Sequence, residues 1–359
     1  MNDIFTAAKH FFPCENDIKC KPLGCGHINS TYLITTPRGK YVMQRINTSI
    51  FKDVDGLMSN VQAVTHHIRR KARAEGCDPE RATLHFMPTP NGDRYLLNEG
   101  CVYRLYVYID KAYTIEKMEN EEDFYWAGVA FGKFANDLSD FDASILSETI
   151  ANFHNTVSRY NDFEKAVEAN ISGRRDEVSD EIEFVRARKS FTSLFVDRLN
   201  DGSLPVRVTH NDTKINNVLF DEASNRPSTV IDLDTVMPGS YLYDFGDAIR
   251  SGATHAAEDE KNLDLVDFDL GLYEAFTKGY LSQCKDSLTE VEIELLPYAS
   301  IMLTLECGMR FLGDHLNGDV YFRIHREGHN LDRCRTQFKL VHEMENKIEE
   351  MKKIIEKYL

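Results

Sequence analysis

Three polar residues lie beside short apolar segments in the second half of the chain, in an order suited to phosphoryl transfer. Residues 208–221 read VTHNDTKINNVLFD, with Asp212 and Asn217 between an apolar lead-in and an apolar tail. A second apolar segment, STVIDLDTVMPGS, carries Asp232. In kinase-type sites, an aspartate accepts the hydroxyl proton while an amide and a later carboxylate bind Mg²⁺. We therefore expect Asp212 to act as the base and Asn217 and Asp232 as metal ligands.

Each of these residues also has an ordinary structural explanation. Asp212 could cap a turn, Asn217 could bond to the backbone, and Asp232 could end a strand. The three together, in this order and on these segments, favour the catalytic interpretation. Nearby, we expect His210 to hydrogen-bond the loop backbone, and Lys214 either to neutralise phosphate charge or to remain solvated.

Length and composition limit the classes of protein to which the chain can belong. It has 359 residues and a hydrophobic content of 42%, enough for two lobes with real cores. Acidic residues outnumber basic ones by 58 to 42 and no basic block stands out, so no nucleic-acid partner is expected. No apolar run reaches the roughly 18 residues that a membrane helix needs, and the N-terminus has no basic-then-apolar leader. We expect a cytoplasmic protein without a membrane partner; its oligomeric state is unknown from the sequence.

The sequence pattern changes after residue 110. Residues 18–47 and 93–110 alternate as strands around glycine turns, and a helical stretch near 55–74 separates them. Beyond that point we expect helices at 123–139, 177–199, 267–283, 289–316 and 333–358. Short strands are expected at 206–210, 217–220 and 229–233. The pattern predicts an α+β protein with a small N-terminal β-sheet lobe at 1–110 and a larger, mainly helical C-terminal lobe at 111–359.

Segments along the whole chain resemble one enzyme family. HNDTKINN, IDLD and YDFGDAIR resemble the aminoglycoside phosphotransferase and choline kinase-like superfamily. Within it, GCGHINSTYLI, QRINTSIF and ECGMRFLGDHLNGDVYF are similar to the N-acetylhexosamine 1-kinases. This resemblance implies a bilobal protein-kinase-like fold that uses ATP and Mg²⁺. It also implies transfer of the γ-phosphoryl group to the anomeric hydroxyl of N-acetylglucosamine or N-acetylgalactosamine.

The resemblance also implies which residues bind the sugar. His27, in GHIN, and Arg310, in ECGMRFL, are expected to contact it, with Tyr321 as a further contact. Asp234 is expected to support the metal or the acceptor. Glu306 precedes Arg310 by one helical turn, so it either forms a structural salt bridge with Arg310 or holds it toward the sugar.

The nucleotide is expected to bind in the N-terminal lobe. Gly24 and Gly26 lie in its first hairpin, where they either satisfy a turn with positive φ or belong to a loop whose backbone N–H groups cover phosphates. We favour the second interpretation, although the full G-x-G-x-x-G pattern is absent. Tyr108, at the end of the second β-rich segment, is also expected to contact the nucleotide.

One position departs from the kinase pattern. Alternation with Val42 puts Gln44 where the phosphate-binding lysine would stand. The helix that would supply its glutamate partner, at 57–72, contains no acid. We expect Gln44 to donate a neutral hydrogen bond to the nucleotide. Arg45 or Lys40 could supply charge, but Arg45 should point to the other face of the strand.

Two other functions fit part of the pattern. The chain could be a small-molecule kinase for choline, an aminoglycoside or another sugar, and a cationic acceptor would call for an aromatic and acidic pocket. It could also be a catalytically silent binding module of kinase fold, which the missing Lys–Glu pair supports. The intact Asp212, Asn217 and Asp232 weigh against a silent module, and only the subgroup segments weigh against another acceptor.

Overall fold

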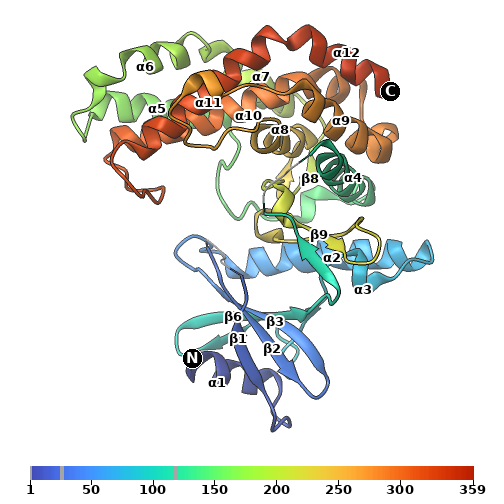
Figure 1. Ribbon diagram of the computed structural model, residues 1–359. Helices are drawn as coiled ribbons and strands as arrows, with labels where there is room; N and C mark the ends of the chain where they lie inside the picture. Colours follow the sequence, from blue (N-terminus) through green and yellow to red (C-terminus); the bar gives the residue numbers. More distant parts are fainter. Residues whose placement is uncertain (1, 25–27, 117–119) are drawn as a thin grey trace. The chain divides into compact units, whose positions relative to one another are not determined.

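Residues 2–24, 28–116 and 120–359 are described by a computed structural model, shown in Figure 1. They fold as two units, each of which gathers segments that are separate in the chain. The first unit takes in Met1–Tyr113, Ser144–Ile150 and Leu219–Met237. The second takes in Thr114–Ala143, Ala151–Val218 and Pro238–Leu359. The division of the lobes at residue 110 stays a prediction.

The first unit contains the antiparallel sheet expected from the N-terminal sequence. Its strands follow the order β1–β2–β3–β6–β4, and β5 also pairs with β6. Their bounds are β1 (Lys19–Pro22), β2 (Ser30–Thr36), β3 (Gly39–Ile46), β4 (Phe86–Met87), β5 (Leu96–Asn98) and β6 (Cys101–Val107). Two smaller sheets have the order β10–β9–β7 and β11–β8. Their bounds are β7 (Ala112–Thr114), β8 (Arg207–Thr209), β9 (Val218–Asp221), β10 (Pro227–Val230) and β11 (Met237–Gly239).

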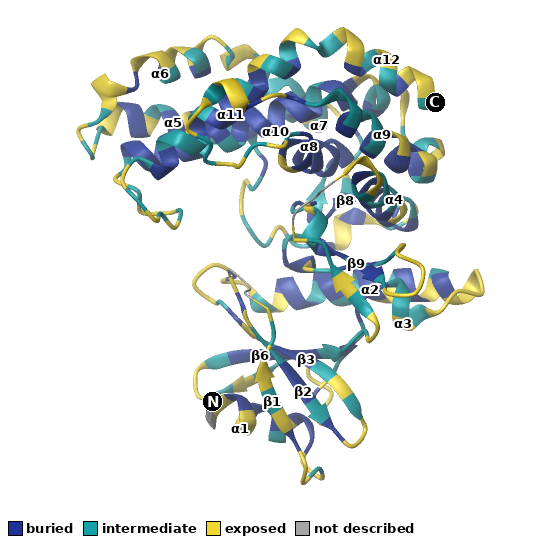
Figure 2. Ribbon diagram, in the orientation of Figure 1, coloured by how far each residue is buried: buried dark blue, intermediate teal, exposed yellow. Residues whose placement is uncertain are grey.

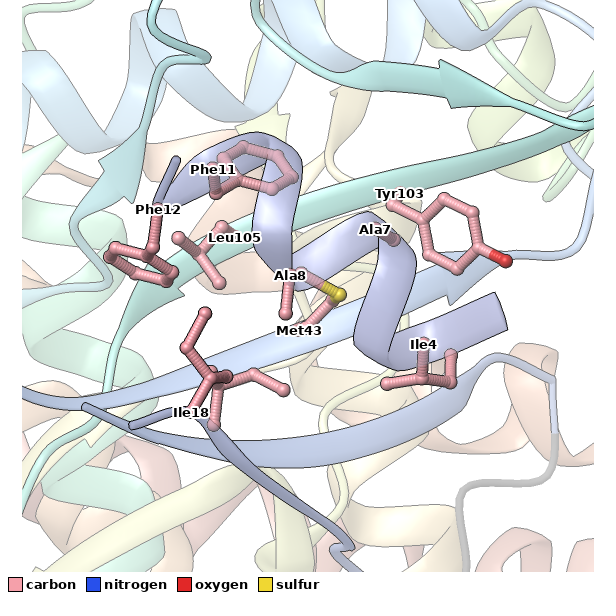
Figure 3. Close-up of a cluster of buried hydrophobic side chains, with 10 residues drawn as sticks. Ile4, Ala7, Ala8, Phe11, Phe12, Ile18, Met43, Tyr103 and Leu105 are labelled. Carbon is pink, nitrogen blue, oxygen red and sulfur yellow. The ribbon is translucent and has the colours of Figure 1, made fainter. Parts of the chain in front are cut away.

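A short helix that the sequence analysis did not predict covers one face of the large sheet. The apolar side chains of α1 (Asn2–Phe11) pack with Met43 and Leu105 in one cluster (Figure 3). Met43 and Leu105 are opposite partners in the antiparallel register of β3 and β6. Because side chains alternate between the faces of a sheet, the neighbouring partners Gln44 and Arg104 lie on the face opposite α1.

The helix expected near 55–74 is α2 (Val54–Ala74), which is followed by the short α3 (Pro79–Ala82). Buried Asn60 ties α2 to two segments from later in the chain. Its side-chain amide donates to the carbonyl oxygens of Ser147, at 2.7 Å, and Val236, at 3.0 Å. Its oxygen accepts from the Ser147 N–H at 2.8 Å. These bonds explain how distant segments join the first unit.

The second unit is mainly helical, as the sequence predicts. Its helices are α4 (Glu121–Asp137), α5 (Thr156–Ala169), α6 (Ser179–Arg186), α7 (Leu194–Asp201), α8 (Tyr241–Gly252), α9 (Leu270–Cys284), α10 (Glu290–Leu316), α11 (His329–Asn346) and α12 (Ile348–Tyr358). The sequence analysis missed α5 and α8. Figure 2 shows that α8 and α10 are largely buried, so they form the interior of this unit.

Two predicted helices are each divided. The stretch at 177–199 breaks between α6 and α7, where the Thr192 hydroxyl donates to the Lys189 carbonyl at 2.7 Å and competes with the helical pattern. The stretch at 333–358 breaks at Lys347, which leaves helical geometry and donates to the Phe268 carbonyl at 2.7 Å.

The longest helix is the one described helix that bears on the question of a membrane span. By length and composition α10 could cross a bilayer, whereas the sequence analysis found no apolar run of sufficient length. Within the described residues, 83% of its apolar window is buried. The helix starts at a capping box in which Thr289 and Glu292 exchange bonds. Packing against α5, α8 and α11 accounts for its apolar composition.

Glycines bring α4 and α9 into backbone contact. A Cβ at Gly279 would lie 2.1 Å from the Tyr125 carbonyl oxygen, and one at Gly128 would lie 2.3 Å from the Phe276 carbonyl oxygen. Gly132 is similarly close, at 2.4 Å from the carbonyl oxygen of the residue it faces on α9. No side chain fits at these points, because the obstructing atoms belong to the backbone.

We expect Gly279→Ala to lower the free energy of unfolding by about 1–3 kcal/mol, since the added methyl forces the two helices apart. Gly313→Ala is the matched control, because a Cβ there meets nothing within 4 Å. That control should leave stability unchanged or raise it by up to about 1 kcal/mol. Urea unfolding followed by circular dichroism measures both, and equal effects would contradict the packing described here.

Candidate active site

The loop between β8 and β9 brings Asp212 and Asn217 together within the second unit. A short 3₁₀ turn at Ile215–Asn217 returns the chain toward Asp212. The Asn217 side-chain amide then donates to the Asp212 carboxylate at 3.0 Å and to its carbonyl oxygen at 2.8 Å. The Lys214 ammonium lies 2.8 Å from the same carboxylate. The loop therefore joins the expected base, amide and cation.

Two buried carboxylates of α8 hold this loop by its backbone. The Asp244 carboxylate accepts from the N–H of His210, at 2.8 Å, and of Asn211, at 2.7 Å. The Asp247 carboxylate accepts from the Thr213 N–H at 3.1 Å. The Thr213 hydroxyl in turn donates to the Asp244 carbonyl at 2.6 Å. The orientation of the loop thus depends on α8, for whose two acids the sequence analysis had no role.

The acids of α8 had a recognisable signal in the sequence. In YDFGDAIR, Asp244 and Asp247 are spaced i, i+3 on one helix face, and buried carboxylates need hydrogen-bond partners. Arg250 provides one of those partners, with a guanidinium–carboxylate distance of 2.8 Å to Asp247. The loop backbone provides the others, which could be found only from the fold.

His210 has the structural role that the sequence analysis predicted. It is fully buried, and its Nδ1 accepts from the Asp212 N–H at 3.3 Å. Its ring makes edge contacts with the rings of Phe131 and Phe134, both at 5.7 Å. The prediction of a histidine that hydrogen-bonds the loop backbone is confirmed.

Burial and nearby charges shift the pKa values of two groups at the loop. Burial raises the pKa of Asp244 to about 6, although the hydrogen bonds from the N–H groups of His210 and Asn211 act in the opposite direction. Burial disfavours the charged form of Lys214, but the carboxylates of Asp212 and Asp247 outweigh burial and raise the pKa of Lys214. Lys214 therefore stays positively charged beside the expected base.

A second cluster in the same unit surrounds Arg310. Its guanidinium lies over three aromatic rings, with centroid distances of 5.9 Å to Phe153, 5.9 Å to Tyr321 and 5.4 Å to Phe322. Glu306 does not form the expected salt bridge with Arg310 in the described part of the chain. It lies 3.0 Å from the Nδ1 atom of His154 instead, and both side chains are buried. The sequence analysis missed His154, which lies far from Glu306 in the chain.

The aromatic segment of this cluster is fixed from α10. The Asp314 carboxylate accepts the backbone N–H groups of Val320, at 3.0 Å, Tyr321, at 2.8 Å, and Phe322, at 2.9 Å. Asn330 donates to the same carboxylate at 2.9 Å. Tyr321 itself is 72% exposed, so its ring is available to a ligand while its backbone is held.

In the first unit, the Gln44 side chain hydrogen-bonds to two other polar side chains. Its side-chain oxygen accepts from Arg104 Nε, at 2.9 Å, and Nη2, at 2.7 Å, and its amide donates to Thr31 at 3.2 Å. Arg104 also lies 2.5 Å from the Asp234 carboxylate, whose other oxygen accepts from Asn29 at 2.5 Å. The assignment of Gln44 and Asp234 to ligands stays a prediction.

Four further residues were expected to contact a ligand: Gly24, Gly26 and Tyr108 the nucleotide, and His27 the sugar. Gly24 has a φ of +70° and open space around it, as a turn glycine requires, whereas Gly26 and His27 lie outside the described residues. Tyr108 donates its N–H to the Lys40 carbonyl at 3.1 Å. The Lys40 ammonium lies 3.1 Å from Asp110.

The donor chemistry of the expected metal ligands fits magnesium. Among the described residues, no three His, Cys, Asp or Glu side chains gather as a metal site. Magnesium, however, binds few protein groups and takes its other oxygens from phosphates and water. Asn217 uses its amide nitrogen on Asp212, which leaves its carbonyl oxygen for a cation. Asp232 adopts a left-handed backbone with φ of 59°, a conformation found often at functional sites.

The chain matches a family profile described as the phosphotransferase enzyme family over residues 19–280. It belongs to the phosphotransferase enzyme family. The matched region contains the loop with Asp212 and Asn217 and the two carboxylates of α8. The resemblance at superfamily level is thereby confirmed.

Solved structures with the fold of this phosphotransferase include three kinases or phosphotransferases. The aminoglycoside phosphotransferase from Alicyclobacillus acidocaldarius has a TM-score of 0.62 at 13% identity, over 98% of this chain and 96% of that chain. The GDP and kanamycin complex of APH(2″)-IIia has a TM-score of 0.57 at 15% identity, over 96% and 98%. A microcompartment-associated aminopropanol kinase has a TM-score of 0.56 at 14% identity, over 97% and 98%. At these identities the likeness concerns the fold alone, and it confirms the predicted protein-kinase-like α+β class.

We expect turnover by this phosphotransferase to decline below about pH 6, where Asp244 becomes protonated. An ionised carboxylate accepts stronger hydrogen bonds than a neutral one, so protonation loosens the bonds to His210 and Asn211. Because the folded-state pKa lies above the usual aspartate value of 3.8, the free energy of unfolding falls as pH rises from 3.8 to about 6. Loss of turnover below pH 6 therefore reflects the loop and not unfolding at this group.

The measurement is a pH profile of kcat for the wild type and for Asp244→Asn, which is neutral at every pH. The variant should be slow at pH 8 and should lack the acidic limb near pH 6. An unchanged limb in the variant would assign that limb to another group.

Proposed function

We propose that this phosphotransferase is an ATP- and Mg²⁺-dependent kinase that phosphorylates the anomeric hydroxyl of N-acetylhexosamines. The observation that carries the proposal is the fixed loop in which Asp212 is paired with Asn217 and Lys214. The family match supports phosphoryl transfer. The segments similar to N-acetylhexosamine 1-kinases support the choice of acceptor.

In the proposed reaction, Asp212 accepts the proton of the anomeric hydroxyl. The anomeric oxygen forms a bond to the γ-phosphorus of ATP, and the bond from that phosphorus to the β-bridging oxygen breaks to release ADP. A hemiacetal hydroxyl is more acidic than an ordinary alcohol because the ring oxygen stabilises its conjugate base, so a positioned carboxylate suffices as the base. When bound, Mg²⁺ neutralises charge on the phosphates. Asn217 and Asp232 are the residues proposed to hold it.

The cluster around Arg310 favours a neutral acceptor over a cationic one. Aromatic rings that bind a quaternary ammonium group must leave their faces free for it. Here the Arg310 guanidinium already lies over three rings. Arg159 is a neighbouring cation: burial and the positive charge of Arg310 both lower its pKa. A cationic acceptor would be repelled by both arginines, whereas hydroxyl and acetamide oxygens accept hydrogen bonds from arginine.

We expect Asp212→Asn to lower kcat by on the order of 10²–10⁴, because an amide cannot take the proton. Asp180→Asn, an exposed acid of α6, is the matched control and should retain activity. The assay incubates each protein with Mg-ATP and a panel of free sugars and amino alcohols, and ³¹P NMR locates the phosphate on the product. Near-normal turnover in Asp212→Asn would remove the assigned base. Phosphate on an amino alcohol alone would replace the proposed acceptor.

We expect Arg310→Ala to raise the sugar KM about tenfold or more while the ATP KM changes little, since the loss is a polar contact to the acceptor. Arg335→Ala, which removes an arginine paired with Glu181, is the matched control. Steady-state kinetics with each substrate varied in turn gives both constants. A larger effect on the ATP KM would take Arg310 out of the acceptor site.

A further inference from the structure

The network around Arg104 places a buried cation next to the position where the kinase pattern lacks its lysine. Arg104 on β6 and Gln44 on β3 are opposite partners in the antiparallel register. Opposite partners have Cβ atoms only about 4.5–5.5 Å apart and point to the same face. A guanidinium that starts from β6 therefore reaches the space that a lysine at position 44 would occupy.

Arg104 also has the carboxylate partner that α2 does not supply. Its guanidinium lies 2.5 Å from the Asp234 carboxylate, and the two side chains are 3% and 4% exposed. In kinases an acidic residue on the helix pairs with the lysine and sets its position. Asp234 comes instead from the segment that carries Asp232, so the partner of Arg104 lies two positions after this expected metal ligand.

Tyr106 lies two residues after Arg104 on β6, so both side chains are on the same face of the sheet. Tyr106 on β6 has its pKa raised, first by burial and then by the carboxylates of Asp232 and Asp234, while the charge of Arg104 lowers it. Of these charged groups, Arg104 and Asp234 are in direct contact, at 2.5 Å. This local grouping belongs entirely to the first unit.

One donor of Arg104 has no partner. Two of its nitrogens bond to Gln44, but Nη1 is buried and has no hydrogen-bond partner within the described residues. A buried donor without a partner costs about 1–3 kcal/mol, so such a group in a folded protein calls for an explanation. An anionic oxygen is the strongest acceptor for a guanidinium N–H.

We propose that Arg104 binds a phosphate oxygen of the nucleotide through Nη1, in place of the missing β3 lysine, and that Asp234 is the positioning residue that holds it. This inference rests on the proposed use of ATP. The two cations considered from the sequence do not compete for the role. Arg45 pairs in register with Tyr103, on the face covered by α1, and Lys40 is occupied by Asp110.

The test compares the affinities for ADP and for adenosine, measured by isothermal titration calorimetry on the full chain. Arg104→Gln should weaken ADP binding by about 10- to 100-fold, the range for a lost hydrogen bond to a charged group. Adenosine, which lacks phosphates, should bind as before. Arg45→Gln is the matched control and should change neither affinity. A purely structural role for Arg104 would alter both ligands alike.

A second pair of variants isolates the charge from the packing. Gln44→Lys with Arg104→Gln returns a cation to β3, whereas Gln44→Met with Arg104→Gln has similar bulk and no charge. The first should bind ADP at least about tenfold more tightly than the second, with equal adenosine affinity. Equal ADP affinities would overturn the inference. Unfolding of every variant that lacks Arg104 would make it a folding residue and would overturn the inference as well.

Failure of the proposed function gives a different result. If wild-type protein binds neither ATP nor ADP, the kinase proposal fails, and the role of Arg104 in binding the nucleotide fails with it. If wild type binds ADP and Arg104→Gln binds it equally well, only the role of Arg104 is lost. Because the readout needs no acceptor, an error in the choice of sugar affects neither outcome.

Discussion

The capture of loop N–H groups by the carboxylates of α8 is the interaction on which the candidate site depends. Asp212 and Asn217 belong to a segment with little regular structure, so their positions must be imposed from outside. Three bonds from the backbone N–H groups of His210, Asn211 and Thr213 do this. Ionised acceptors make such bonds stronger than neutral ones. The carboxylates of Asp244 and Asp247 thus accept the backbone N–H groups that strand pairing satisfies elsewhere.

The helix that carries these carboxylates is itself fixed by close packing. Gly246 lies between Asp244 and Asp247, and a Cβ there would meet the carbonyl oxygen of Ala299 on α10 at 2.4 Å. The backbones of α8 and α10 therefore touch, and α10 is the long buried helix of the unit. Since α10 also carries Arg310 and Asp314, one buried helix packs against the helix that holds the Asp212 loop and also carries residues of the aromatic cluster.

Much of this arrangement could be predicted from the sequence, because periodicity reports local structure. The alternation around Val42 located β3 correctly, and it put Gln44 and Arg45 on opposite faces as observed. The place of Asp212 and Asn217 in one loop between short strands was also predicted, whereas the bonds from Asn217 to Asp212 were not. Contacts between distant parts of the chain could not be predicted. The contact of Arg104 with Gln44 depends on the strand register, and the contact of His154 with Glu306 depends on the packing of α10. The prediction of a Glu306–Arg310 pair was wrong because the Glu306 carboxylate contacts the imidazole of His154 instead.

The register between β3 and β6 has a wider consequence. Two residues that face each other across a pair of strands have neighbouring Cβ atoms. A long side chain from either strand can therefore bring its charged group to the same position. Family comparisons made column by column would then record a loss at one site and an unrelated substitution at another. Examining the neighbour across the sheet, and not only the aligned position, distinguishes an abandoned function from a relocated one.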